Sequence, residues 1–284
     1  MVRRSNSFVV GFLLAPVLAA AALSVHAQGP DYLADRGDGI RTSLLATYIR
    51  PKEFVFYPFY EYTRKKNFEY KASDLGFVGS TDFDGGRLTE REFLVYFGYA
   101  FNDSLMIEFE SALHNKAEFR KAANDTTGVP AQINESGLGD TEAQVRWRFA
   151  KETETRPDVT FFFETVFPLQ KNQRLIGSRD WQFVTGTVLS KGYSFGTLSL
   201  RASVAYDRAD RQVQFGEYAI DYLKKLSPAW RVALTLEGTS TDLSVIGEVQ
   251  YELSKNATLK LNSGFGITKK DRALAPEIGV LFRF

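Results

Sequence analysis

The chain has 284 residues, and its 35 Lys and Arg residues nearly balance its 34 Asp and Glu residues. It contains no cysteine, which excludes disulfide bonds and thiolate metal sites. A near-neutral chain also lacks the basic surplus that binds phosphate backbones, so nucleic acid is not an expected partner.

Residues 1–27 are typical of a secretory signal peptide. Arg3 and Arg4 precede an apolar run from residue 8 to residue 23, and Val25 and Ala27 supply the small residues of a cleavage site. The alternative is a membrane anchor, but the apolar run is short for a membrane-spanning helix. Cleavage before Gln28 leaves about 257 residues, enough for one large domain.

Residues 28–52 precede the first regular pattern. Asp31, Asp35 and Asp38 lie among glycines and predict a flexible periplasmic lead segment. Residues 40–49 could form a short helix, an extra strand or a plug that enters a lumen. We favour a segment outside the barrel wall, and the sequence leaves its structure open.

Residues 53–284 alternate between apolar and polar positions in run after run, which is the pattern of strands with one apolar face. The connections are alternately short and long, as periplasmic turns and extracellular loops are. We therefore predict an all-β fold, a transmembrane antiparallel up-and-down β-barrel of about twelve strands. The predicted strands are residues 54–64, 91–101, 105–114, 140–149, 159–167, 181–189, 196–206, 215–224, 230–238, 243–253, 259–267 and 276–284.

The two faces of these strands differ in polarity, and the apolar face is expected to meet lipid. It includes Phe97, Phe109, Val145, Trp147, Leu200 and Leu234. A soluble β-barrel or sandwich is the alternative, but it would be apolar inside. The polar face here holds too many charges for a dry core, because a buried charge is costly unless it is paired.

The polar face is predicted to line a pore. The predicted lining residues are Glu61, Glu108, Glu110, Glu142, Gln144, Arg146, Arg148, Glu164, Arg201, Glu217, Asp221, Arg231, Glu237, Glu248, Glu252 and Lys260. With Glu277 and Arg283 the inward set holds five more acids than bases, so the lumen is expected to prefer cations. Glu108 and Glu110 are adjacent on this face and are expected to contribute most to that preference.

Catalysis has two candidate arrangements on the barrel. After signal cleavage His114 is the one remaining histidine, and alternation points it into the lumen while Ser111 points to lipid, so they do not form a hydrolase pair. Glu108 and Glu110 lie roughly 7 Å apart, a spacing that a glycosidase could use. Pore lining explains the two carboxylates more simply. We predict no catalytic, cofactor or metal site.

Several segments resemble one family. Residues 135–140, Glu-Ser-Gly-Leu-Gly-Asp, followed by Val-Arg-Trp-Arg-Phe at 145–149, resemble a block of the phenol-degradation MetA-pathway family of outer-membrane transporters. Phe167-Pro168, Ser-Arg-Asp-Trp at 178–181, Leu-Ser-Lys-Gly at 189–192 and Gly-Val-Leu-Phe-Arg-Phe at 279–284 agree. The resemblance implies an outer-membrane channel for passive uptake of small molecules, including hydrophobic or aromatic ones. The alternatives are a plugged structural or adhesive barrel and, more weakly, an outer-membrane hydrolase.

The last predicted strand alternates apolar and polar residues up to Phe282 and Phe284. This resembles the C-terminal assembly signal of bacterial outer-membrane barrels. The expected location is therefore the bacterial outer membrane. The expected partners are the barrel assembly machinery, membrane lipid and lipopolysaccharide, and a small-molecule substrate.

Removal of Phe284 is expected to reduce barrel assembly sharply, because it shortens this signal. The measurement is the yield of heat-modifiable barrel in outer membranes. A normal yield without Phe284 would show that the terminal strand has no such role.

Overall fold

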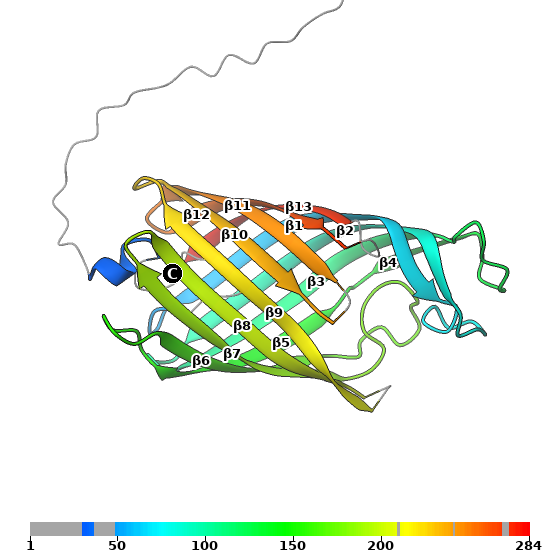
Figure 1. Cartoon of the computed structure of the whole chain (residues 1–284), viewed down its shortest axis with the longest axis horizontal. Helices are drawn as coiled ribbons and strands as arrows, with labels where there is room; N and C mark the ends of the chain where they lie inside the picture. Colours follow the sequence, from blue (N-terminus) through cyan, green and yellow to red (C-terminus); the bar gives the residue numbers. More distant parts are fainter. Residues whose placement is uncertain (1–29, 37–48, 209–210, 241, 269–272) are drawn as a thin grey trace, which may run out of the picture.

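A closed ring of antiparallel strands makes up most of the molecule (Figure 1). The computed structural model describes residues 30–36, 49–208, 211–240, 242–268 and 273–284. The predicted signal peptide and residues 28–29 and 37–48 of the predicted lead lie outside these ranges. The strands are β1 (Phe54–Lys71), β2 (Asp82–Ala100), β3 (Leu105–Arg120), β4 (Gln132–Gly137), β5 (Thr141–Ala150), β6 (Asp158–Val166), β7 (Gln182–Tyr193), β8 (Gly196–Asp207), β9 (Gln212–Lys225), β10 (Trp230–Gly238), β11 (Leu243–Ser254), β12 (Ala257–Gly266) and β13 (Ala273–Arg283).

The order of the strands around the ring follows the sequence, with one exception. β13 pairs with β1 and closes the ring, and β3 pairs with β2 on one side and β5 on the other. The short strand β4 pairs with the far part of β3. Twelve strands therefore form the wall, as the sequence predicts, and β4 lies at the end opposite to the C-terminus (Figure 1).

The wall is apolar outside and mostly polar inside. Leu234 and Trp147 are 54% and 52% exposed, whereas their chain neighbours Thr235 and Arg146 are each 3% exposed. Such a reversal of the usual soluble pattern suits a wall surrounded by hydrocarbon, where outward charges are costly and inward charges can meet water. The alternation found in the sequence thus reflects a membrane-facing surface.

Three neighbouring strands extend beyond their predicted ends. β1 continues to Lys71, β2 begins at Asp82 and β3 continues to Arg120, whereas alternation predicts ends near residues 64, 91 and 114. The added parts are charged, with ion pairs such as Lys71–Asp82 at 3.7 Å and Arg91–Glu118 at 3.1 Å. One face of these extensions meets water, and the other packs Tyr70, Leu88 and Phe119 in an apolar cluster, so the long apolar alternation that reveals a lipid-facing strand is lost. The unpredicted strand β4 is short, and most of its residues are polar.

A β-bulge in β3 changes the direction in which His114 points. Phe93 pairs with His114 and Leu94 pairs with Ala112, so Leu113 is the extra residue. Phe93 is exposed on the outer face, and His114 is exposed beside it. The prediction that His114 faces the lumen is wrong, because one inserted residue reverses the alternation of the strand.

The extensions and the loop between β6 and β7 enclose an apolar cluster beyond the barrel. Glu135 of β4 accepts backbone N–H bonds from Arg174 at 2.8 Å and Leu175 at 2.7 Å, and the Arg174 guanidinium lies 4.2 Å from the Phe77 ring centroid. The long connections lie at this end of the barrel, as extracellular loops do, and we call this cluster the extracellular cap. Its buried residues are Tyr70, Ala72, Leu75, Phe83, Leu88, Ala117, Phe119, Ala122, Val129 and Ile176.

The described parts of the lead segment contact the other end of the barrel. The 3-10 helix η1 (Asp31–Leu33) lies near the C-terminus (Figure 1). Ile49 is fully buried in a cluster with Tyr57, Tyr96 and Met106. No helix within the described ranges is long and apolar enough to cross a membrane.

The substitution Leu234→Arg is expected to destabilise the barrel far more than Thr235→Arg. An outward Arg near the bilayer midplane costs about 2–4 kcal/mol, whereas an inward Arg meets water and acidic side chains. Reversible urea unfolding in lipid vesicles measures both variants. Equal losses of unfolding free energy would contradict the assignment of the two faces.

Candidate functional site

The inner wall of the barrel carries a dense set of charged side chains. They alternate with the apolar outer residues, so the strand period itself directs them into the lumen. The residues predicted to line a pore lie on this inner face: Glu61, Glu108, Glu110, Glu142, Gln144, Arg146, Arg148, Glu164, Arg201, Glu217, Asp221, Arg231, Glu237, Glu248, Glu252 and Lys260. The structure divides them into groups with different partners.

The first group lines a cavity of about 200 Å³ beside β3, β5, β6, β8 and β9. Within it Glu108 is fully paired. Its carboxylate lies 2.8 Å from Arg146 Nε and accepts a hydrogen bond of 2.6 Å from the Tyr96 hydroxyl. Both charges of the Glu108–Arg146 pair are buried, so they largely cancel where they meet.

Glu110 and Glu142 face each other in the same cavity. They are directly opposite in the β3–β5 register. No basic side chain within the described ranges forms an ion pair with either of them. Like charges directly across a strand pair repel each other. This arrangement therefore favours any cation that can approach both carboxylates.

A single arginine serves two further acids in this cavity. Arg201 Nη2 lies 3.4 Å from Glu217 and 3.9 Å from Glu164, and the guanidinium stands 4.4 Å from the Phe162 ring centroid. Gln144 donates a hydrogen bond to Glu164. Even with Arg201 and Arg146 counted, acids outnumber bases around the cavity.

A second cavity of about 230 Å³ lies beside β10, β11, β12 and β13. Lys260 pairs with Glu248 at 3.1 Å, and its ammonium lies 5.0 Å from the Tyr57 ring centroid. The Tyr57 hydroxyl donates to Glu277. Among the residues that line this cavity, Glu61 and Glu237 add two more acids, so it too is acidic.

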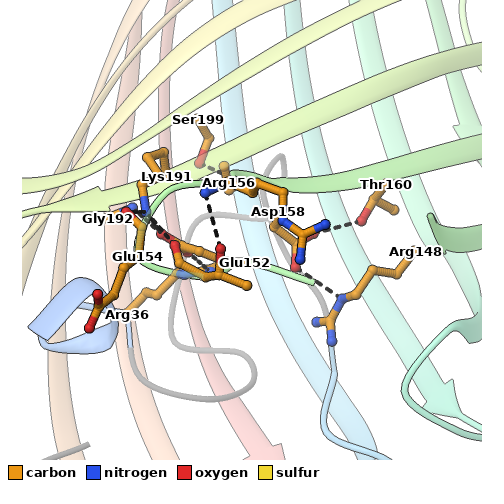
Figure 2. A network of polar contacts seen from close by, with 12 residues as sticks. Arg36, Arg148, Glu152, Glu154, Arg156, Asp158, Thr160, Lys191, Gly192 and Ser199 are labelled. Carbon is orange, nitrogen blue, oxygen red and sulfur yellow. Dashed lines mark hydrogen bonds and ion pairs between the residues drawn. The ribbon is translucent and has the colours of Figure 1, made fainter. Parts of the chain in front are cut away.

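At the end of the lumen near the C-terminus the acids are paired with bases. Glu252 lies 2.8 Å from Arg231 and 3.0 Å from Arg283. Figure 2 shows a neighbouring network, in which Arg148 pairs with Asp158 at 3.0 Å. The middle of the lumen is thus acidic, whereas this end carries acids that are matched by bases.

Two lumen acids escaped the sequence analysis. Glu90 and Glu92 pair across β2 and β1 with Thr63 and Glu61, on the inner face. Glu92 accepts a hydrogen bond of 2.6 Å from Asn115. Within the predicted strand 91–101, Glu92 and Phe93 point to opposite faces, so Glu92 could have been assigned to the lumen from the sequence. Glu90 precedes the predicted strand, so the alternation could not assign it to the lumen.

The arrangement offers no constellation for catalysis in the described ranges. His114 is outside the lumen, and the Ser111 hydroxyl is 2.8 Å from the Thr141 hydroxyl, on the outer face. Glu108 is held by Arg146 and Tyr96, so Glu108 and Glu110 are not an equivalent pair. No group of three or more His, Asp or Glu side chains there is placed to hold a metal ion.

Comparison with known proteins identifies the fold. No protein-family model and no curated protein sequence matches the chain. Among solved structures, the COG4313 outer membrane channel from Pseudomonas putida F1 is similar, with a TM-score of 0.61, 10% identity, and coverage of 84% of this chain and 97% of that one. KdgM porin has a TM-score of 0.46 and 12% identity, and the match covers 79% of this chain and 99% of that one. Outer membrane phospholipase A from Escherichia coli has a TM-score of 0.46 and 9% identity, and the match covers 89% of this chain and 97% of that one. The chain has the fold of outer-membrane β-barrels, and with its apolar outer face it belongs in the bacterial outer membrane.

The substitution Arg146→Met is expected to destabilise the barrel by about 3 kcal/mol, because it leaves the buried Glu108 carboxylate without its partner. Adding Glu108→Gln should restore much of the loss. Lys151→Met is the control, since its pair with Asp103 at 3.8 Å is exposed and worth less than about 1 kcal/mol. Vesicle unfolding of the three variants gives the comparison, and a double variant no more stable than Arg146→Met would contradict the pairing.

Proposed function

We propose that the protein is an outer-membrane channel for the passive uptake of small molecules. The observation that carries this proposal is that Glu110 and Glu142 face each other in an inner cavity. No basic residue in the described part of the chain forms an ion pair with either carboxylate. A structural barrel with a dry interior would neutralise such charges, because an unpaired buried charge is costly. Water in the lumen removes that cost, and a water-filled lumen conducts.

The acidic wall favours positively charged solutes. Charges along a narrow lumen act over about 8 Å at physiological salt, a distance comparable to the size of the cavity. The resemblance to the phenol-degradation MetA-pathway family favours hydrophobic or aromatic solutes. Small solutes that combine an apolar or aromatic part with a positive charge satisfy both arguments, and we propose them as the preferred class.

Support from solved structures is limited to the fold. The similar structure from Pseudomonas putida F1 is described as an outer membrane channel. At 10% identity this similarity supports the barrel architecture of the present chain and nothing more specific. The channel function rests on the inner wall, and so do the proposed pore-lining roles of its acids.

We do not propose an enzyme. A hydrolase would need His114 as its proton shuttle, and His114 lies on the outer face away from the inner cavities. Ester hydrolysis that disappears in His114→Ala would reverse this view. A plugged structural or adhesive barrel is the remaining alternative, and it would show no conductance in planar bilayers.

The channel is expected to prefer cations, and the double substitution Glu110→Gln with Glu142→Gln is expected to weaken that preference. The measurement is the reversal potential in a potassium chloride gradient across a planar bilayer. Removing two unpaired charges from the cavity should move this potential toward zero.

The matched control is Glu118→Gln with Asp82→Asn, which makes the same change of charge on the extensions beyond the barrel. Its reversal potential should equal that of the wild type. Anion selectivity of the wild type, or an equal shift in both double variants, would contradict the role of Glu110 and Glu142.

A further inference from the structure

Residues 30–36 dock on the barrel end that holds the C-terminus (Figure 1). Asp35 and Arg36 are buried, at 5% and 9% exposure, although they lie on a short segment outside the wall. Burying two opposite charges of one segment requires partners for both. Each of them finds its partners on the barrel.

Arg36 pairs with Glu152 in the turn between β5 and β6 (Figure 2). The Glu152 side chain is 1% exposed, lies 3.2 Å from Lys191 Nζ and accepts the Gly192 N–H at 2.7 Å. One carboxylate thus joins the docked segment to the end of β7. Removing the charge of Glu152 would leave the Arg36 guanidinium buried without this ion pair.

Asp35 reaches the inner wall itself. Its carboxylate accepts the Lys225 N–H at 2.9 Å and lies 3.4 Å from Lys224 Nζ. Its backbone carbonyl accepts a hydrogen bond of 3.1 Å from Arg231 Nε. Arg231 is one of the fully buried inward residues of β10. The segment therefore enters the rim of the lumen and does not merely rest on the outside.

Gly192 allows the segment to approach so closely. A Cβ atom at this position would lie 1.7 Å from the Tyr32 carbonyl oxygen, a contact that no side chain can make. The three atoms nearest to that Cβ all belong to Tyr32, so the clash concerns the segment and not the barrel wall. The Lys191 ammonium also lies 5.0 Å from the Tyr32 ring centroid. Docking and a glycine at position 192 depend on each other.

We propose that residues 30–36 form a periplasmic latch, which narrows the exit of the lumen while Glu152 and Gly192 hold it in place. This inference rests on the proposed channel function. The latch uses the end of the lumen where acids are paired with bases, and Asp35 and Arg36 add one acid and one base to these paired residues. When the segment undocks, it withdraws the Asp35 carbonyl from Arg231 and widens the exit.

The test compares Gly192→Ala with Gly247→Ala. The second variant adds the same methyl group to another strand, where a Cβ would meet nothing within 4 Å. Both are made in the full chain with Asp31→Cys, which gives one spin-label site because the chain has no cysteine. Asp31 is exposed, so the label reports whether the segment is docked.

In Gly192→Ala the ratio of immobile to mobile label should fall about ten-fold or more, because overpacking on this scale disfavours the docked state. Its single-channel conductance should exceed that of Gly247→Ala, which should match the wild type. Glu152→Gln should change both readings in the same direction, but less, because glutamine can still accept the Gly192 N–H.

Two results would overturn the latch. The first is a label that stays immobile in Gly192→Ala. The second is a label that becomes mobile while the conductance stays at the value of the conducting wild type and Gly247→Ala. If no variant conducts although the label is mobile, the proposed channel function fails, and the latch fails with it.

Discussion

Closure of the ring between β1 and β13 is the constraint on which the other features depend. In hydrocarbon no water can satisfy a free strand edge, and each unpaired backbone group would cost several kcal/mol. Phe54 and Phe284 exchange two backbone hydrogen bonds, of 3.1 and 2.9 Å, at the rim. The pairing continues along the strands as far as Lys65 and Ala273. The two ends of the barrel sequence must therefore meet before either is stable in the membrane.

Closure also decides what the inner wall can contain. Once the apolar face of every strand is turned to lipid, the polar face has nowhere to lie except the lumen. Charges there must be paired or hydrated. Glu108 with Arg146 shows the first solution, and Glu110 with Glu142 requires the second. A lumen that contains both is partly a scaffold and, in the proposed channel, partly a path for solutes.

Outside the bilayer these constraints relax, and the structure becomes less regular. The extensions of β1, β2 and β3 carry charged residues, and their other face packs in the small apolar core of the extracellular cap. The bulge at Leu113 turns His114 outward where β3 begins its extension. At the opposite end Asp35 and Arg36 bring a segment from outside the wall into the rim. Both ends of the barrel are thus shaped by pieces that do not belong to the ring.

The sequence by itself determined the twelve wall strands and the two faces of each, because a period of two residues is a local property that lipid on one side makes strict. It could not determine β4, the bulge or the partner of each lumen acid. The alternation is the same for Glu108 and Glu110, yet only the register of β3 on β5 pairs one with Arg146 and leaves the other facing Glu142. Likewise, the sequence around Gly192 does not explain why a glycine stands there until Tyr32 is placed against it. These features join residues far apart in the chain, so only the tertiary structure could decide them.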